Sequence, residues 1–337
     1  MARRCCRICW DNSGPMDKIV SIIIPVYNTP LEYLEACFTS VRMQKYPLLE
    51  PIVVDDGSDE LTAKLLERIC GQEFKILHKK NGGLSDARNF GIARCSGDYV
   101  YLLDSDDELA FDGAIESFVA AAEGSSADIV VGAYHYEGVA GGPCYPESGP
   151  DWLVDCLRAG VSFSAADQLY SRALLSRMDG LFRVGLVHED EEFTPRALME
   201  SHLVVGLPGT KTYARSEREG SLTKSASAKS CFKRCEGKLI VARDSLSNDG
   251  FSLNQTLRTL MDERAFSFVN MALRAWAENL CGTEYERTLQ DLAEQVDYSR
   301  SRFSVRTTRS LRNWFCMALL RLVGVPNYVA LLRRTLR

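Results

Sequence analysis

The sequence predicts an α/β fold built on an open, mostly parallel sheet with flanking helices. From Met16 onward, short apolar runs alternate with segments of helical periodicity, which is typical of repeated strand and helix units. Each of the first four predicted strands runs directly into a polar loop. Loops that follow parallel strands share the carboxyl edge of the sheet, where such folds bind ligands. We therefore expect these loops to meet in one crevice.

Each element follows from apolar patterning and from residues that begin or end helices. Continuous apolar runs of four to eight residues predict buried strands, and apolar residues three to four apart predict helices. Ser58 is predicted to cap the second helix, which ends at Gly71. The predicted strands are 20–24, 51–54, 74–77, 99–103 and 129–136, and the predicted helices are 31–41, 58–71, 85–93 and 191–201.

Composition restricts the class of protein. Of the 337 residues, 46% are hydrophobic and 25% are charged, values that exclude a wholly disordered chain. The twelve cysteines follow no secretory segment, so we expect reduced thiols in a cytosol. No apolar run reaches the roughly 20 residues that a membrane-spanning helix needs. We expect a cytoplasmic protein that does not cross a membrane by itself.

The chain is expected to divide into regions of different composition. Cys5, Cys6 and Cys9 lack a fourth ligand nearby for a structural zinc site, so a disordered extension is the favoured interpretation of the first residues. Nine arginines and no acidic residue lie between Arg300 and Arg337, although the net charge of the whole chain is −5. The expected regions are the extension (1–15), an α/β domain (16–225, divided at 135/136) and a helical C-terminal region (226–337) with a basic tail (300–337).

The loop after the fourth strand carries the clearest chemical signal. The loop places three carboxylates close together, those of Asp104, Asp106 and Asp107. A divalent cation would relieve their mutual repulsion. Such a loop suits Mg²⁺ or Mn²⁺, held by one or two carboxylates and completed by substrate phosphates. The alternative is an acidic turn that caps a helix after Glu108.

The other loops suit a nucleotide. Tyr27 could stack on a base, and Asp55 and Asp56 could accept hydrogen bonds from a base or from ribose. The backbone of Gly82-Gly83 and the guanidinium of Arg88 could approach a diphosphate. The alternatives are an ordinary turn and N-cap at Asp55-Asp56-Gly57-Ser58, and a surface ion pair of Arg88 with Asp86 or Asp98.

The segments SIIIPVYN, VVDDGSD and NGGLSDARNFGIARCSGDYVYLLDSDD resemble, in order and spacing, the family-two glycosyltransferases of the GT-A fold. The resemblance spans residues 18–110 and continues weakly to Thr223. It implies a nucleotide-sugar site, with Asp104 near ribose and metal and Asp106 as metal ligand. The nucleotide-sugar-binding positions that we expect from the loops and the resemblance together are Pro25, Tyr27, Asn28, Asp55, Asp56, Gly83, Arg88 and Asp104.

The resemblance also points to residues in the second half. Val187-His188-Glu189-Asp190 is similar to the family's Glu-Asp motif, which implies that Asp190 is the base and Glu189 the fallback. The alternative is the acidic first turn of a helix. Tyr213-Ala214-Arg215 with Arg218 is similar, more loosely, to the stretch that closes the donor site, so these arginines are expected at the diphosphate.

The expected function is inverting transfer of one sugar from a nucleotide-diphosphate sugar, UDP by family habit, to a glycan or lipid-linked acceptor in cell-surface polysaccharide synthesis. Gln255-Thr256-Leu257-Arg258 is followed by Thr259 and not by the tryptophan of processive synthases. A nucleotidyltransferase and a non-catalytic nucleotide- or glycan-binding relative remain alternatives. A nicotinamide oxidoreductase is disfavoured because no G-x-G-x-x-G follows the first strand.

The basic tail suggests a further partner. Beyond Arg300, arginines alternate with apolar residues, which suits an amphipathic helix on the anionic inner face of a membrane; the apolar residues are Leu311, Trp314, Phe315, Leu319 and Leu320. Packing of this helix on the rest of the protein is the alternative. Nucleic acid is disfavoured as a partner because the predicted catalytic region is acidic.

Overall fold

The computed structural model describes residues 17–132, 146–207, 209, 211–216, 227–297 and 311–335. Contacts divide the chain into two compact units. The first holds the described residues up to Gly185 and those from Phe193 to residue 216, and the second holds Leu186–Glu192 and the described residues from Ser227 on. The predicted extension 1–15 and the boundaries predicted at 135/136 and 225/226 lie outside the described residues.

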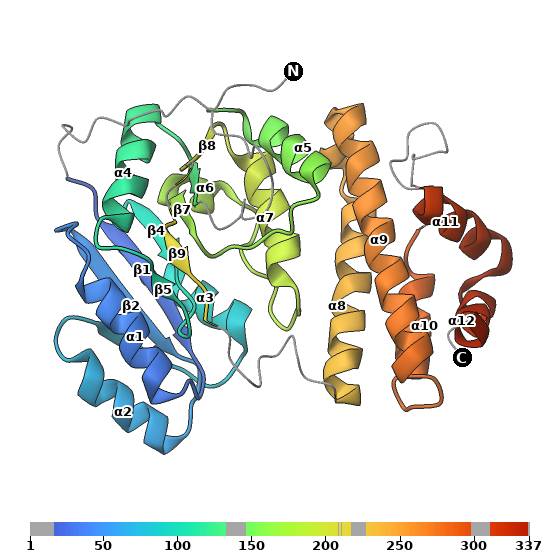
Figure 1. Ribbon diagram of the computed structural model, residues 1–337, viewed down its shortest axis with the longest axis horizontal. Helices are drawn as coiled ribbons and strands as arrows, with labels where there is room; N and C mark the ends of the chain where they lie inside the picture. The colour runs from blue at the N-terminus through green and yellow to red at the C-terminus, as the bar shows by residue number, and fades with distance from the viewer. Residues whose placement is uncertain are drawn as a thin grey trace. The chain divides into compact units, whose positions relative to one another are not determined.

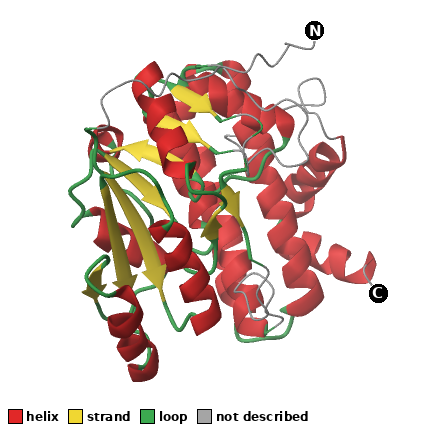
Figure 2. Cartoon of the chain, turned by 60° about the vertical axis from the view of Figure 1, so that its left-hand side comes forward, coloured by secondary structure: helices red, strands yellow, loops and turns green. Residues whose placement is uncertain are grey.

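The first unit is built on a seven-stranded sheet (Figure 1). All its neighbouring strands pair in parallel except β7, which is antiparallel to both β4 and β6. Figure 2 shows these strands in yellow among the flanking helices. In the order in which they lie across the sheet, the strands are β3 (Lys75–His78), β2 (Leu49–Asp55), β1 (Val20–Val26), β4 (Tyr99–Leu102), β7 (Gln168–Ser171), β6 (Ile129–Val131) and β8 (Val204–Gly206).

Burial explains the central strands. Every residue of β1 and β4 is buried, as continuous apolar runs in a covered parallel sheet require. Phe38 stacks against Phe74 with ring centroids 4.8 Å apart in the core beside the sheet. The helices are α1 (Leu31–Arg42), α2 (Glu60–Cys70), α3 (Leu84–Ile92), α4 (Ala114–Ser125), α5 (Gly149–Ala159), α6 (Arg172–Arg177) and α7 (Glu189–Glu200).

Two local predictions need correction. The cap of α2 is Asp59, whose side chain accepts a hydrogen bond from the N–H of Thr62, and not Ser58. Because α2 begins at Glu60, the capping position is residue 59, and the Ser58 hydroxyl accepts the N–H of Asn28 instead. The segment after the acidic loop forms the two-residue strand β5 (Glu108–Leu109), so the interpretation of this loop as a helix cap is also wrong.

The second unit is helical. Its long helices α8 and α9 run side by side (Figure 1), and Phe232 stacks on Tyr285 within their common core with α10. Arg258, near the start of α9, donates to the carbonyl of Leu246 at 2.7 Å and so satisfies a C-terminal carbonyl of α8. The helices are α8 (Ala228–Ser247), η2 (Asp249–Leu253), α9 (Gln255–Asn279), α10 (Glu286–Glu294), α11 (Leu311–Val323) and α12 (Val325–Thr335).

The basic tail forms two helices in its described part, separated at Gly324. Met317 and Leu320 of α11 and Tyr328 of α12 are buried in the core of the second unit. The alternative that the tail packs on the rest of the protein is therefore correct for the buried faces of α11 and α12. Arg300 to Ser310 lie outside the described residues. Among the described helices, none is both long and apolar enough to cross a lipid bilayer.

Candidate active site

The loops after β1, β2 and β4 lie at one edge of the first unit's sheet. These strands pair in parallel, with Val26 opposite Asp55 and Ile23 opposite Leu102. The same edge therefore receives the segments that begin at Tyr27, Asp56 and Leu103. A hydrogen bond of 2.8 Å between the hydroxyls of Thr29 and Ser105 joins two of these loops. Neither hydroxyl carries a distinctive signal in the sequence, and we did not predict this link.

Arg88 is the most deeply placed charge of this site. Its side chain, on α3, is only 1% exposed and donates from Nη2 to Oδ1 of Asp104 at 2.9 Å. Its guanidinium also lies 5.2 Å from the ring centroid of Phe182. The alternative of a surface pair with Asp86 or Asp98 is wrong because the side chain is buried.

Asp104 and Asp106 keep part of their surface open. The side chain of Asp104 is 33% exposed, and Asp106 is half-buried. Two hard carboxylates fit a divalent cation that arrives with phosphate oxygens. Among the residues that the structure describes, no group of three or more His, Cys, Asp or Glu side chains forms a complete metal site. The donor set thus fits a metal shared with a substrate rather than one enclosed by protein.

Asp107 anchors the other side of the acidic loop. Its buried carboxylate accepts hydrogen bonds from the hydroxyl of Tyr213 at 2.6 Å and from the N–H of Ser216 at 2.8 Å. Burial, together with the nearby charges of Asp104 and Asp106, raises the pKa of Asp107 to about 6 although both hydrogen bonds lower it. The sequence singled out Asp107 only as part of the acidic loop, not as an anchor.

Strand pairing brings Arg215 beside this loop. β5 pairs antiparallel with β9 (Tyr213–Ala214), with Glu108 opposite Ala214. Arg215 follows β9 directly and is exposed, and the next residue, Ser216, donates its N–H to Asp107 of the acidic loop. Arg218 and the stretch from Ser221 to Thr223 lie outside the described residues.

Asp55 is held at the end of β2. It is buried, and its two oxygens take the N–H of Ser58 at 2.9 Å and the Nδ1 of His78 at 2.9 Å. Burial alone would raise the pKa of Asp55, but the hydrogen bonds from Ser58 and His78 bring it below its usual value. His78 appeared isolated in the sequence, yet the parallel register of β2 and β3 pairs it directly with Asp55.

Asp56 shapes the glycine loop. Its carboxylate accepts the N–H groups of Gly82 at 2.9 Å and Gly83 at 2.7 Å, and Lys79 Nζ lies 2.5 Å from the same carboxylate. Both N–H groups that we expected at a diphosphate thus donate to Asp56 in this structure, and their contact with a diphosphate stays a prediction. Asp56 organises the loop through these contacts.

The segment that ends β1 presents an aromatic side chain. Pro25 is buried within the strand opposite Val54, whereas the side chain of Tyr27 is 53% exposed. Asn28 has φ of +47° and its side-chain oxygen accepts the N–H of Asp59 at 2.8 Å. Asn28 thus ties the β1 loop to the β2 loop and fixes the backbone next to Tyr27.

The predicted Glu-Asp pair belongs to the second unit. Glu189 and Asp190 stand in the first turn of α7, which begins two residues earlier than predicted. Glu189 is buried, and Asp190 is half-buried. An acidic first turn suits the helix dipole, so the structural interpretation and the catalytic one are compatible here.

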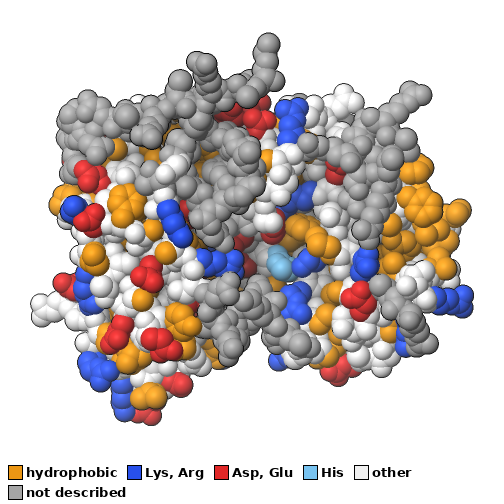
Figure 3. Space-filling model, in the orientation of Figure 1, with side chains coloured by type: hydrophobic (Ala, Val, Ile, Leu, Met, Phe, Trp, Pro, Cys, Tyr) orange, Lys and Arg blue, Asp and Glu red, His pale blue; other side chains and the backbone are white. Residues whose placement is uncertain are grey.

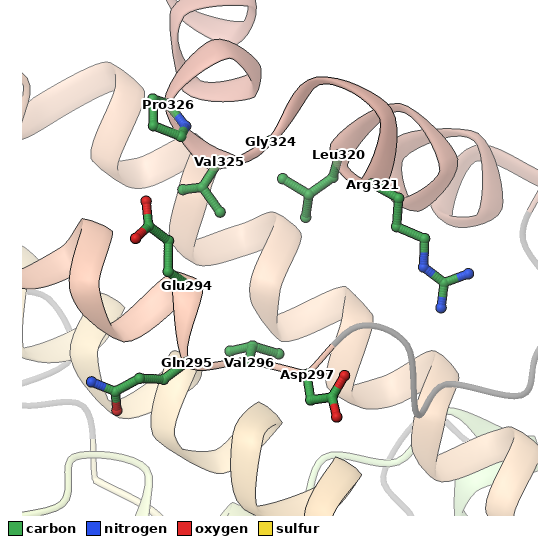
Figure 4. Close-up of a pocket in the computed structure, with 9 residues that line it drawn as sticks. All are labelled: Glu294, Gln295, Val296, Asp297, Leu320, Arg321, Gly324, Val325 and Pro326. Carbon is green, nitrogen blue, oxygen red and sulfur yellow. The ribbon is translucent and has the colours of Figure 1, made fainter.

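A separate cleft of about 550 Å³ lies within the second unit (Figure 4). It is formed by the end of α10 and by the junction of α11 and α12. None of the predicted site residues lines it. Its lining residues are Glu294, Gln295, Val296, Asp297, Leu320, Arg321, Gly324, Val325 and Pro326.

Solved structures share this architecture. The crystal structure of S. aureus TarS residues 1–349 in complex with UDP-GlcNAc matches with a TM-score of 0.68 and 20% identity, over 95% of this chain and 91% of that one. The mannosyltransferase PcManGT from Pyrobaculum calidifontis, in complex with GDP-Man and Mn²⁺, matches with a TM-score of 0.54 and 16% identity, over 97% and 89%. The predicted GT-A-type fold with C-terminal helices is confirmed.

Curated relatives agree with the fold. Glycosyltransferase GlyG of Streptococcus pneumoniae is 32% identical over 144 residues, which are 42% of this chain and 47% of the relative. Glycosyltransferase GlyA of the same species is 29% identical over 62% of this chain and 32% of its own length. The chain thus spans less than half the length of these relatives. The family described as Glycosyl transferase family 2 matches residues 21–173. The matched part of the chain, which carries the acidic loop and Arg88, is thus similar to glycosyl transferase family 2.

Proposed function

We propose that this chain is a glycosyltransferase that moves one sugar from a nucleotide-diphosphate sugar, a UDP-sugar, to a hydroxyl of a glycan or lipid-linked acceptor. The carrying observation is the buried Arg88–Asp104 pair, which holds the Asp104-x-Asp106 loop at the ligand-binding edge of the sheet. The complex of TarS with UDP-GlcNAc supports the choice of donor class. Cell-surface polysaccharide synthesis is the process in which such an acceptor occurs.

The donor is assigned to the loops of the first unit. Tyr27 is exposed enough to stack on a base. Asp55, ionised at neutral pH because its pKa is lowered, is available as an acceptor near the base or ribose. Arg215 is assigned to the diphosphate because its guanidinium can form two parallel bonds to phosphate oxygens.

Asp104 and Asp106 are assigned as the residues that hold Mg²⁺ or Mn²⁺. When bound, the cation neutralises charge that develops on the departing diphosphate. The Mn²⁺ in the PcManGT complex supports this assignment. Arg88, by holding Asp104 at 2.9 Å, fixes one of the two carboxylates before any ligand arrives.

Asp190 is assigned as the base, with Glu189 as the fallback. Asp190 takes the proton from the acceptor hydroxyl while the hydroxyl oxygen bonds to the anomeric carbon. The bond from that carbon to the diphosphate oxygen breaks, and the nucleoside diphosphate leaves with the electron pair. Attack from the face opposite the diphosphate inverts the anomeric configuration.

The test is donor binding and donor hydrolysis. The protein is incubated with UDP-, GDP- and dTDP-sugars, with and without Mn²⁺, while thermal shift and nucleoside diphosphate release are followed. We expect one donor class to stabilise the protein only with metal, and Asp106→Asn and Asp190→Asn to lower turnover by roughly two orders of magnitude or more. Release of pyrophosphate instead of nucleoside diphosphate would identify a nucleotidyltransferase. No shift with any donor would refute the proposal.

We also propose contact of α11 with an anionic membrane surface. Phe315 is 62% exposed and Leu322 is 82% exposed on this helix, although its other face is buried. Figure 3 shows hydrophobic side chains gathered over α11. No acidic residue follows Asp297 in the sequence, so the segment that forms α11 and α12 has arginines but no Asp or Glu. Exposed apolar residues among arginines suit an anionic lipid surface.

A further inference from the structure

The turn before the Glu189-Asp190 pair has an unusual backbone. His188 has φ of +74°, a left-handed conformation that residues other than glycine seldom adopt. Its carbonyl accepts the N–H of Glu191 at 3.1 Å and so closes the first turn of α7. A conformation of this kind persists only when its surroundings hold it in place.

Lys238, on α8, holds the ring of His188. Its Nζ lies 2.7 Å from Nε2 of the imidazole. Burial, together with the nearby charges of Lys238 and Arg234, lowers the pKa of His188 to about 4. The imidazole is therefore neutral near pH 7. Because an ammonium group can only donate, Nε2 is the acceptor and the ring proton resides on Nδ1.

Gly237 allows α8 to approach this turn closely. A Cβ atom at Gly237 would lie only 2.1 Å from the carbonyl oxygen of Val187. This separation is far below any real contact, so a side chain at position 237 would displace the turn. The neighbouring residue Lys238 reaches His188 because the two backbones touch here.

Arg264, on α9, holds the other side of the pair. Its Nη2 donates to the carbonyl of Glu191 at 2.8 Å, and it also forms an ion pair with the Glu191 carboxylate. Both side chains are mostly buried. The Glu189-Asp190 pair is thus bracketed by His188, fixed to α8, and by Glu191, fixed to α9.

We propose that Lys238 and Arg264 are positioning residues for the proposed base: they hold the turn from which Asp190 projects, so the C-terminal helices take part in building the catalytic motif. The inference rests on the proposed function. It assigns α8 and α9 a role beyond packing, which the sequence alone did not indicate. A geometric fault of about 1 Å at a catalytic group can cost on the order of 100-fold in rate.

The test uses Lys238→Met, which keeps the aliphatic stem and removes the donor. Lys233→Met is the matched control, since Lys233 is an exposed lysine of the same helix, paired with Glu236 at 2.6 Å. UDP-sugar hydrolysis is followed as nucleoside diphosphate release, and donor affinity is followed by thermal shift. We expect Lys238→Met to lower the turnover number roughly 10- to 100-fold with unchanged donor affinity. The control should match the wild type.

Combining Lys238→Met with Asp190→Asn distinguishes an effect through Asp190 from a purely structural effect of Lys238. If Lys238 acts through Asp190, adding Lys238→Met to Asp190→Asn lowers turnover no further. Arg264→Gln provides an independent variant with the same expectation. Wild-type turnover in Lys238→Met, additive losses, or a joint loss of donor affinity and folded structure would each overturn the inference while leaving the proposed function intact. A wild-type protein that neither binds nor hydrolyses any donor would overturn both.

Discussion

Asp104→Asn should destabilise the protein, whereas Asp106→Asn should not. Asp104 is the carboxylate partner of Arg88, whose side chain is only 1% exposed. Removing one member of a buried ion pair costs about 3–5 kcal/mol because the other charge remains in the interior. Asparagine keeps one acceptor oxygen, and Asp104 is one-third exposed, so we expect a smaller loss than that range, about 2–3 kcal/mol.

The assay is thermal and urea unfolding followed by circular dichroism, without nucleotide or metal. A loss of this size lowers the melting temperature by roughly 4–10 °C in a unit of this length. Asp106→Asn, in the same loop and half-buried, is the control and should shift stability by no more than about 0.5 kcal/mol. Donor turnover should fall steeply in both variants.

Equal melting temperatures for the two asparagine variants would refute this reasoning. The Arg88–Asp104 contact would then contribute nothing to the fold, and burial of the guanidinium would need another source of compensation. Loss of turnover in both variants with a difference in stability is the result that assigns two roles to Asp104. It would be both a structural partner of Arg88 and a ligand of the donor complex.

Two further predictions concern pH and lipid. The pKa of Asp107 in the fold, about 6, lies above its unfolded value, so its burial opposes folding above pH 6 and this penalty disappears as the pH falls toward 4. Asp107→Asn should therefore reduce the change in the free energy of unfolding between pH 4 and 6 by up to about 3 kcal/mol, as measured by urea unfolding. An unchanged pH dependence in this variant would contradict the raised pKa of Asp107. Vesicles containing phosphatidylserine should float the wild type but not a double variant Phe315→Ser, Leu322→Ser, whereas equal flotation of both would exclude α11 as the contact.

The sequence alone was sufficient to predict the ligand-binding edge of the sheet and the acidic loop that lies on it. Val20–Val26 and Tyr99–Leu102 are almost wholly apolar, as is typical of strands that are covered on both faces of a parallel sheet. The residues after them had to reach the carboxyl edge. Arg88 was predicted as a binding residue, but its burial depended on tertiary packing against Phe182, which no local pattern reports.

The contacts that the sequence could not supply are those between distant loops. Asp56 was interpreted as a nucleotide ligand because a carboxylate after a strand is available in principle. Its two oxygens contact Gly82, Gly83 and Lys79, more than 20 residues away, and no local pattern predicts these contacts. Lys238 gave no signal at all, because a lysine in a long helix is usually a solvated charge. Its contact with His188, and the close approach of the two backbones at Gly237, appear only in the folded chain.

The aspartates of the acidic loop differ in their protein partners and in their exposure. Asp107 is buried, and its carboxylate accepts hydrogen bonds from Tyr213 and Ser216. These bonds hold β9 and the backbone of the neighbouring Arg215 in place. One oxygen of Asp104 accepts a hydrogen bond from Arg88, and a third of the Asp104 side-chain surface remains exposed. A cluster of carboxylates would repel itself if all were equally exposed, and sharing them among protein partners reduces that repulsion before a cation arrives. The open carboxylate surface that remains, on Asp104 and Asp106, fits the proposed cation, since a cation that also binds substrate phosphates needs only one or two protein carboxylates.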